Sequence, residues 1–284
     1  AGGLIQVNTK DVPARNFLNV QLGTGFNTQT MGNDFYAYQG GKTDFLGYDD
    51  GTRGLPANMP TKTQFANLTQ AEKTAYASGF ENIWSTNKKS SIFTPSLNQS
   101  IAISGGFKTN VGKRNKLAAI LAVNYNRSNK RTVSQNQINT FQNNTPDLSF
   151  NYFNKKYSQD VLAGALANIT LQLGSNHKIS FKNLLNVNTT NYTTLREGKD
   201  FDGAANVVLG DNIRASELAF KANTFFNTQL TGEHKIRKYD AKFQWFGSFN
   251  ILDQYIPDQR RLQFLQDDSN DPSSPYRAVI GGSN

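Results

Sequence analysis

The stretch from Ala165 to Asn188 alternates apolar and polar residues on both sides of a short polar segment, Gly174 to His177. Successive side chains of a β-strand point to opposite faces, so this pattern predicts a hairpin with one apolar and one polar face. No neighbouring segment is apolar enough to cover the apolar face. The apolar positions recur at every second residue: Ala167, Ile169, Leu171 and Leu173 before the turn, and Ile179, Phe181, Leu185 and Val187 after it.

The same alternation recurs along the chain in strands of about 12 to 17 residues. Asn183 and Leu184 interrupt the phase of one strand and predict a β-bulge there. The predicted strands are Arg15 to Asn27, Leu97 to Lys108, Leu117 to Arg131, Tyr157 to Leu173, Lys178 to Tyr192, Ser216 to Leu230 and Ala241 to Tyr255.

The connections between these strands alternate in length. Thr109 to Lys116, Gly174 to His177 and Thr231 to Asp240 are short, whereas Thr132 to Lys156 and Asn191 to Ala215 are long and rich in Asn, Gln, Asp and Gly. We expect the long connections to be loops. Short turns at one end and long loops at the other predict an antiparallel up-and-down sheet.

The first connection contains the one predicted helix. Thr69 and Glu72 have capping-box spacing, and Gly79 is placed to end a short helix. This helix is expected to decorate a loop.

Composition narrows the class of protein. The hydrophobic fraction is 37%, the mean hydropathy is −0.56 and no window approaches 18 apolar residues, which excludes a membrane-spanning helix. The absence of Cys excludes disulfides and thiolate metal sites. The net charge of +9 is dispersed, with Asn126 to Arg131 the densest basic run, so no nucleic-acid partner is predicted.

The predicted strand length distinguishes a transmembrane β-barrel from a soluble β-sandwich. Soluble strands usually have about 5 or 6 residues, so the predicted lengths favour an all-β, antiparallel up-and-down transmembrane β-barrel whose apolar face meets outer-membrane lipid. Four tyrosines mark the far strand ends, where a lipid interface would lie: Tyr125, Tyr157, Tyr192 and Tyr255. The first, second and fourth share the parity of their strand's apolar face, and Tyr192 does so only if the bulge shifts it. A nonspecific porin or structural outer-membrane barrel, and a soluble β-sandwich binding protein, remain alternatives.

About seven strands with two free edges cannot close, because an open edge in hydrocarbon leaves backbone groups unpaired. The pattern therefore predicts part of a larger barrel. The first residues contain neither an initiator Met nor a signal-peptide pattern, so we expect the chain to begin within a longer protein.

Two segments carry a family resemblance. AGGLIQVNTKDVP, from Ala1 to Pro13, resembles the junction between plug and barrel in TonB-dependent outer-membrane receptors. GGKTDFLGYDDGTRGLP, from Gly40 to Pro56, resembles the first barrel connection of such receptors from the Bacteroidetes group. The resemblance implies that residues 1–10 form the last strand of a plug domain. Residues 11–284 would then form the N-terminal part of the transmembrane barrel, with long extracellular loops.

The resemblance also implies a function. It would be the energised uptake of an unidentified ligand across the bacterial outer membrane, driven by a TonB-type energy-coupling protein that acts on the plug, with a surface lipoprotein as a further partner. Gln135 to Asp147 and Arg196 to Asn212 would lie outside the cell, and Gly174 to His177 in the periplasm.

No residue pattern points to catalysis, a cofactor or a metal. His177 and His234 fall in predicted turns, far apart in sequence and without a nucleophile pattern, so we expect no enzymatic activity. Asp267, Ser269 and Asp271 have part of a calcium-loop spacing but lack its Gly and closing Glu.

The remaining acidic pairs sit beside glycines. Asp49 and Asp50, like Asp200 and Asp202, are predicted turn formers. Ligand-binding residues are expected on the loops and the upper lumen face, without a preference for Asn143 or Asp200.

Overall fold

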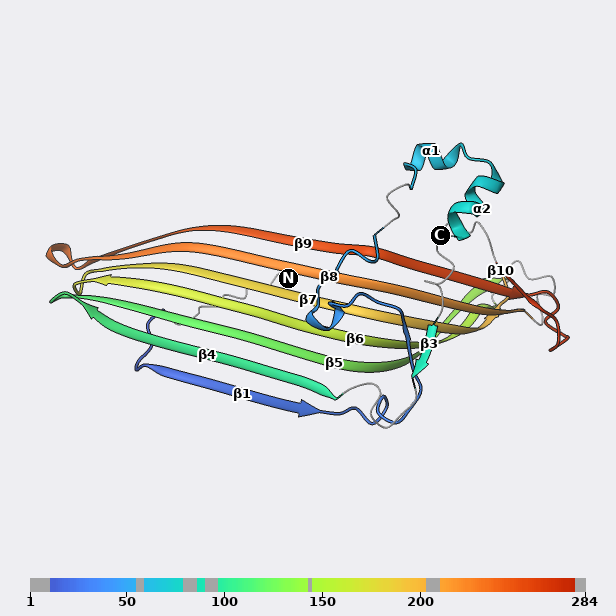
Figure 1. Ribbon diagram of the computed structural model, residues 1–284, viewed down its shortest axis with the longest axis horizontal. Helices are drawn as coiled ribbons and strands as arrows, with labels where there is room; N and C mark the ends of the chain where they lie inside the picture. The colour runs from blue at the N-terminus through green and yellow to red at the C-terminus, as the bar shows by residue number, and fades with distance from the viewer. Residues whose placement is uncertain are drawn as a thin grey trace.

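The computed structural model describes residues 11–54, 59–78, 86–89, 97–142, 145–202 and 210–278. These residues form one eight-stranded sheet with the order β1-β4-β5-β6-β7-β8-β9-β10 and a two-stranded sheet of β2 and β3 (Figure 1). The large sheet contains β1 (Phe17–Gly25), β4 (Asn98–Val111), β5 (Asn115–Gln142), β6 (Thr145–Leu173), β7 (His177–Asp200), β8 (Asp211–Ile236), β9 (Ala241–Gln266) and β10 (Tyr276–Ala278).

All neighbouring strands in the large sheet are antiparallel, so the fold is an all-β meander. The seven predicted strands are present, and β10 is a short addition that pairs with the end of β9. The sheet is open and does not close into a barrel, with β1 and β10 at its two edges.

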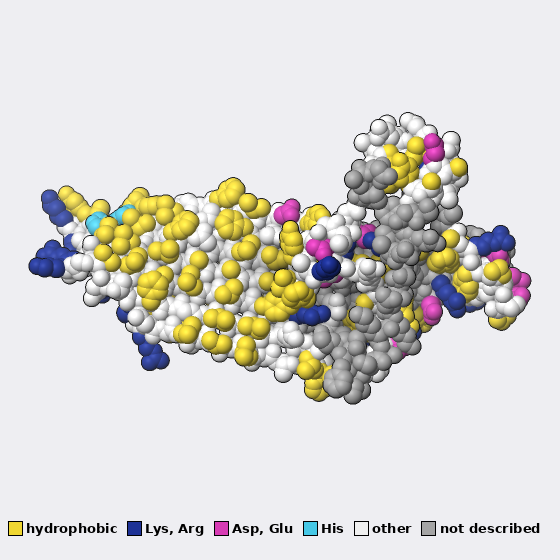
Figure 2. Space-filling model, in the orientation of Figure 1, with side chains coloured by type: hydrophobic (Ala, Val, Ile, Leu, Met, Phe, Trp, Pro, Cys, Tyr) yellow, Lys and Arg dark blue, Asp and Glu magenta, His cyan; other side chains and the backbone are white. Residues whose placement is uncertain are grey.

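The apolar positions of seven strands share one face, here called the apolar face. Across the ladders Ile101 lies opposite Tyr125, and Ile169 lies opposite Phe181. These side chains are uncovered: Leu121 is 53% and Ile169 49% exposed. Figure 2 shows hydrophobic side chains spread over the half of this face that ends at the short turns.

The opposite face, here called the polar face, carries Asn, Ser, Thr, Gln and Lys at the same level. Thr170 and Asn168 lie on it and are almost fully buried. The separation is incomplete, because Phe246 and Leu252 of β9 project from this face and Leu252 is 79% exposed.

The strands are longer than their apolar segments. β5 and β6 have 28 and 29 residues, and their ladder continues to the pair of Gln142 and Thr145. Within the described residues, the prediction of long loops at Thr132 to Lys156 and at Asn191 to Ala215 is therefore wrong, except at residues 201, 202 and 210; residues 143–144 and 203–209 lie outside the description. In these parts polar residues outnumber apolar ones on both faces, although Val133 and Phe153 are exposed there. Hydrophobic alternation therefore ends although backbone pairing continues.

Two register shifts interrupt the ladders. Between Phe220 and Ala222, β9 inserts an additional residue, and Pro257, which has no backbone N–H to donate, lies in this bulge. A second shift frees the carbonyl of Ser149, which accepts hydrogen bonds from the backbone of Phe201 and Asp202.

The predicted bulge at Asn183 and Leu184 is absent, because β7 pairs with both neighbours without a shift. Asn183 instead lies on the apolar face. Its amide is satisfied by the Ala167 carbonyl and the Thr228 hydroxyl, at 3.4 and 2.9 Å.

In the first connection, between β1 and β4, residues 35–47 lie on the apolar-face side of the sheet (Figure 1). Phe35 and Tyr36 pack on Tyr157, which is only 2% exposed. Tyr157 is thus a covered residue, and its prediction as an interfacial aromatic is wrong. The elements of the connection are β2 (Phe35–Tyr38), η1 (Asp44–Leu46), α1 (Lys62–Ala66), α2 (Gln70–Ser78) and β3 (Thr86–Lys89).

The predicted helix is confirmed as α2, and the capping box at its start is formed. Thr69 N donates to Glu72 Oε2 at 2.8 Å, and Glu72 N donates to Thr69 Oγ1 at 3.3 Å. Gly79 and the predicted plug strand, residues 1–10, lie outside the described residues. Among the described residues no helix has the length and apolar character to cross a membrane.

Candidate functional site

A buried ion-pair cluster holds the first connection on the sheet. The guanidinium of Arg53 binds Asp44 through two hydrogen bonds of 2.6 and 2.5 Å and Asp49 through one of 3.0 Å. The Arg53 side chain is 2% exposed, and its guanidinium carbon lies 4.4 Å from the ring centroid of Phe220 in β8. Tyr38 Oη accepts a further hydrogen bond from Nε at 3.2 Å.

Electrostatics explain why a cation is stable there. Burial acts to lower the pKa of Arg53, but the carboxylate of Asp44 and the neighbouring Tyr38 outweigh it and hold that pKa above its ordinary range. Asp49 also accepts a hydrogen bond from Gly51 N, so the predicted turn role is confirmed. Sequence spacing gave no indication of its ion pair with Arg53.

Glycines allow the close packing of this cluster. A Cβ at Gly40 would lie 2.0 Å from an Asp44 carboxylate oxygen, and one at Gly41 would lie 2.5 Å from Asp50. Gly47 has φ +78°, and its carbonyl accepts a hydrogen bond from Thr189 Oγ1 at 2.8 Å. The run from Gly40 to Arg53 thus encodes a docked loop.

On the polar face, beyond the apolar segments of the strands, polar side chains form two hydrogen-bonded groups. In the first, Tyr152 Oη donates to Asp200 at 2.9 Å, and Arg196 donates to Asn154 at 2.7 Å. Burial, and then the hydrogen bond to Asp200, raise the pKa of Tyr152. Asp200, a predicted turn former, also accepts from the backbone of Asp202.

The second group centres on Glu217, which accepts from Tyr192 at 2.9 Å, from Gln259 at 2.6 Å and from Arg261 at 3.2 Å. Burial, the largest influence, acts to raise the pKa of Glu217, but these three partners together lower it. Burial and the Glu217 carboxylate raise the pKa of Tyr192 to about 12. Both groups offer amides, hydroxyls and charges to a polar ligand.

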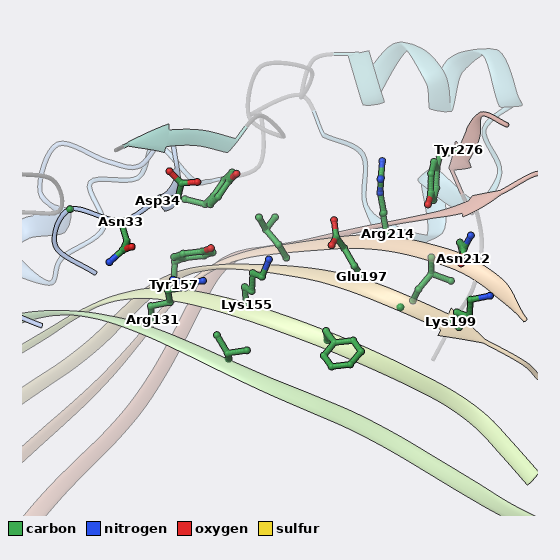
Figure 3. Close-up of a pocket in the computed structure, with 17 residues that line it drawn as sticks. Asn33, Asp34, Arg131, Lys155, Tyr157, Glu197, Lys199, Asn212, Arg214 and Tyr276 are labelled. Atoms are coloured by element: carbon green, nitrogen blue, oxygen red, sulfur yellow. The ribbon is translucent and has the colours of Figure 1, made fainter. Parts of the chain in front are cut away.

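The apolar-face side carries a groove of about 980 Å³ between strands β5 to β8 and the segment 32–36 (Figure 3). Four cations and two carboxylates line it: Arg131, Lys155, Lys199, Arg214, Asp34 and Glu197. The guanidinium of Arg214 lies 4.4 Å from the ring centroid of Tyr276, and Phe153 on the floor is half exposed. The amides of Asn33 and Asn212 complete the polar lining.

His177 and His234, predicted to be turn residues, instead lie in β7 and β8 and are cross-strand partners with Nδ1 atoms 3.0 Å apart. Trp245 Nε1 donates to His234 Nε2 at 3.0 Å, so Nε2 is the unprotonated nitrogen and Nδ1 of His234 donates to His177. Among the described residues, no nucleophilic side chain is hydrogen-bonded to either histidine ring. Only the antiparallel register, which sequence spacing does not give, brings the two rings together.

The suspected calcium spacing forms an ordinary turn. Asp267 pairs with Arg277 at 2.6 Å, and Asp271 accepts hydrogen bonds from Ser273. Within the described ranges, no group of three or more His, Cys, Asp or Glu residues is placed to hold a metal ion.

Comparisons with known protein families, curated proteins and solved structures give no match to this chain. The site is therefore interpreted from its own geometry.

Proposed function

We propose that the chain is the N-terminal part of the barrel of a TonB-dependent outer-membrane receptor of the Bacteroidetes type. One observation carries the proposal. Seven neighbouring strands expose large apolar side chains on one face and polar side chains on the other. A soluble sandwich would cover the apolar face with a second sheet, and no described segment covers its part near the short turns.

Dimensions support a bilayer as the cover. On β6 the apolar face runs from Ala163 to Leu173, which spans about 33 Å along the strand and about 25 Å normal to the membrane at a tilt of about 40°. That height equals the apolar band expected of an outer-membrane barrel. Tyr125 and Tyr255 lie at the upper limit of this face, and the His177, His234 and Trp245 cluster lies at the lower limit.

The open edges require further strands. The outer edge of β1 and most of the outer edge of β9 have no neighbouring strand among the described residues, so a membrane-embedded form needs additional strands to pair them. Exposed Phe246 and Leu252 on the polar face of β9 offer contacts for a plug.

In this proposal the segment performs no catalysis. The polar-face groups around Asp200 and Glu217 face the lumen and contact the ligand, while a periplasmic TonB-type protein moves the plug. The short turns lie in the periplasm and the polar strand extensions outside the cell, where a surface lipoprotein can dock.

Spin labels in the intact receptor test the membrane assignment. The chain contains no Cys, so single cysteines at Ile169 and Asn124 label one site each within it. In reconstituted protein, oxygen should relax the label at position 169 and a water-soluble agent the label at 124. A label at 169 that neither agent reaches would mean that protein covers the apolar face.

Energy coupling separates a gated receptor from a porin. Ligand uptake by intact cells should stop when the inner-membrane gradient is collapsed. Uptake that continues unchanged would favour the nonspecific porin.

A further inference from the structure

The groove lies on the lipid side of the wall and not on the lumen side. Side chains alternate with period two, and the β6–β7 and β7–β8 ladders continue without a shift from the apolar segment into the groove. Lys155 and Ile169 therefore share one face, as do Glu197 and Phe181. A ligand in transit through the lumen would not meet this groove.

The groove also lies at a definite height. Tyr125 ends the apolar segment of β5, and Arg131 follows six residues later, about 20 Å along the strand and about 15 Å above the apolar band. On β6, Lys155 lies about 20 Å above Ala163 by the same estimate. Phospholipid headgroups occupy only about 5 to 8 Å on each side of a bilayer, so their phosphates do not reach this level.

The residues that line the groove indicate the class of ligand that it would bind. Four cations against two carboxylates leave an excess of two positive charges, which favours an anionic ligand. Amides, carboxylates and a tyrosine hydroxyl beside these cations supply the donors and acceptors that sugar hydroxyls need. Figure 3 shows Lys155, Glu197 and Arg214 projecting from adjacent strands toward the same space.

The groove lies on the lipid-facing side of the sheet, above the phospholipid headgroups, and its lining has an excess of positive charge. From these three properties we propose that the groove binds the anionic saccharide headgroup of an outer-leaflet glycolipid. The inference rests on the proposed function, because it places the apolar face in the bilayer. Sugars that carry phosphates or carboxylates extend beyond the phospholipid headgroup layer, and their charges meet Arg131, Lys155 and Arg214. The first connection then acts as a wall that separates this headgroup from the solvent.

Two matched double variants of the intact receptor test the proposal. The groove variant is Arg131→Gln with Lys155→Gln, and the control variant is Lys130→Gln with Lys156→Gln. Each removes two positive charges from adjacent positions of the same two strands, but the control residues have polar-face parity. Both are reconstituted in nanodiscs of zwitterionic phospholipid and titrated with purified lipopolysaccharide.

The groove variant loses two charge-assisted contacts and should bind lipopolysaccharide about tenfold more weakly than the wild type, a difference of about 1.4 kcal/mol. The control variant should bind like the wild type. The soluble saccharide released from the same lipopolysaccharide by mild hydrolysis should compete, whereas phosphatidylglycerol should not.

Several outcomes would overturn the proposal. Equal weakening in both variants would assign the effect to net charge, and unchanged binding in the groove variant would exclude the groove. Competition by phosphatidylglycerol would assign the groove to a phospholipid headgroup. The label at Ile169 is measured in the same nanodiscs, so a failure of membrane insertion is distinguished from a failure of glycolipid binding.

Discussion

Asp44 is held on both carboxylate oxygens. Arg53 Nη1 donates to Oδ1 at 2.6 Å and Nη2 to Oδ2 at 2.5 Å, and Asn191 in β7 also donates to Oδ2 at 3.0 Å. One carboxylate thus links the first connection to a strand more than a hundred residues later. This part-buried carboxylate holds the loop on the sheet together with the hydrogen bond from Thr189 to the Gly47 carbonyl.

Replacement of Arg53 should release the connection. Arg53→Lys keeps the charge but loses the paired donors. Arg53→Ala leaves the part-buried Asp44 and the buried Asp49 without a cation, at a cost of about 3 to 5 kcal/mol. Amide exchange in residues 40–54 should accelerate, with less change in β6. Unaltered protection in the Ala variant would contradict the assigned role.

A charge on the apolar face should destabilise the membrane-embedded protein. Leu121→Arg should cost about 2 to 4 kcal/mol near the midplane, while Asn124→Arg, exposed on the polar face of the same strand, should cost about 1 kcal/mol or less. Thr170 is a poor control because it is 0% exposed and hydrogen-bonded to Ser180. Urea unfolding in lipid vesicles measures both variants, and equal costs would argue against lipid contact.

The Glu217 group should make stability depend on pH in acid. The pKa of Glu217 in the folded protein lies below its ordinary value of 4.5, so its contribution is present above pH 4.5 and is lost as the pH falls through the folded pKa. Glu217→Gln should lower stability at neutral pH by about 1.5 kcal/mol and flatten the acid limb. Thermal unfolding from pH 3 to pH 7 compares the wild type with the Glu217→Gln variant. Parallel curves of stability against pH would contradict a stabilising role of the Glu217 group.

Exposed apolar residues of the first connection should enter the membrane interface. Phe45, Leu46 and Tyr48 are half exposed or more, and the loop lies at the upper limit of the apolar face, where Tyr125 Oη donates to the Phe45 carbonyl. A fluorophore at position 48 should be quenched by lipids labelled near the headgroup, and one at exposed Thr52 less so. Equal quenching would place the loop away from the bilayer.

Alternation in the sequence was sufficient to predict which face each central side chain occupies. Ile169 and Thr170 lie on opposite faces as expected, and Tyr192, whose parity differed, does lie on the polar face. The pattern failed where hydrophobicity stopped before the backbone ladder did. Lys155 and Arg196 are strand residues whose polar neighbours on both faces resemble a loop.

Contacts between distant segments were beyond the sequence pattern. The groove needs the segment around Asp34 to lie above β6, and the pairing of Arg53 with Asp44 needs a loop folded back on the sheet. Neither contact produces a periodic pattern of apolar residues from which it could be predicted. The glycines at 40, 41 and 47 can be read from the sequence. The reason that glycine is needed at these positions is found only in the structure, in the atoms that a Cβ would approach.

The length of the first connection has a consequence for the order of assembly. Every other neighbouring pair of long strands is joined by about ten residues or fewer, whereas β1 and β4 are separated by residues 26–97. Closing a chain of about 70 residues costs roughly 3 kcal/mol more entropy than closing a three-residue turn. We therefore expect β4 to β9 to pair as successive hairpins before β1 pairs with β4. The amides of β1 should then be the last to gain protection from hydrogen exchange during folding and the first to lose it during unfolding.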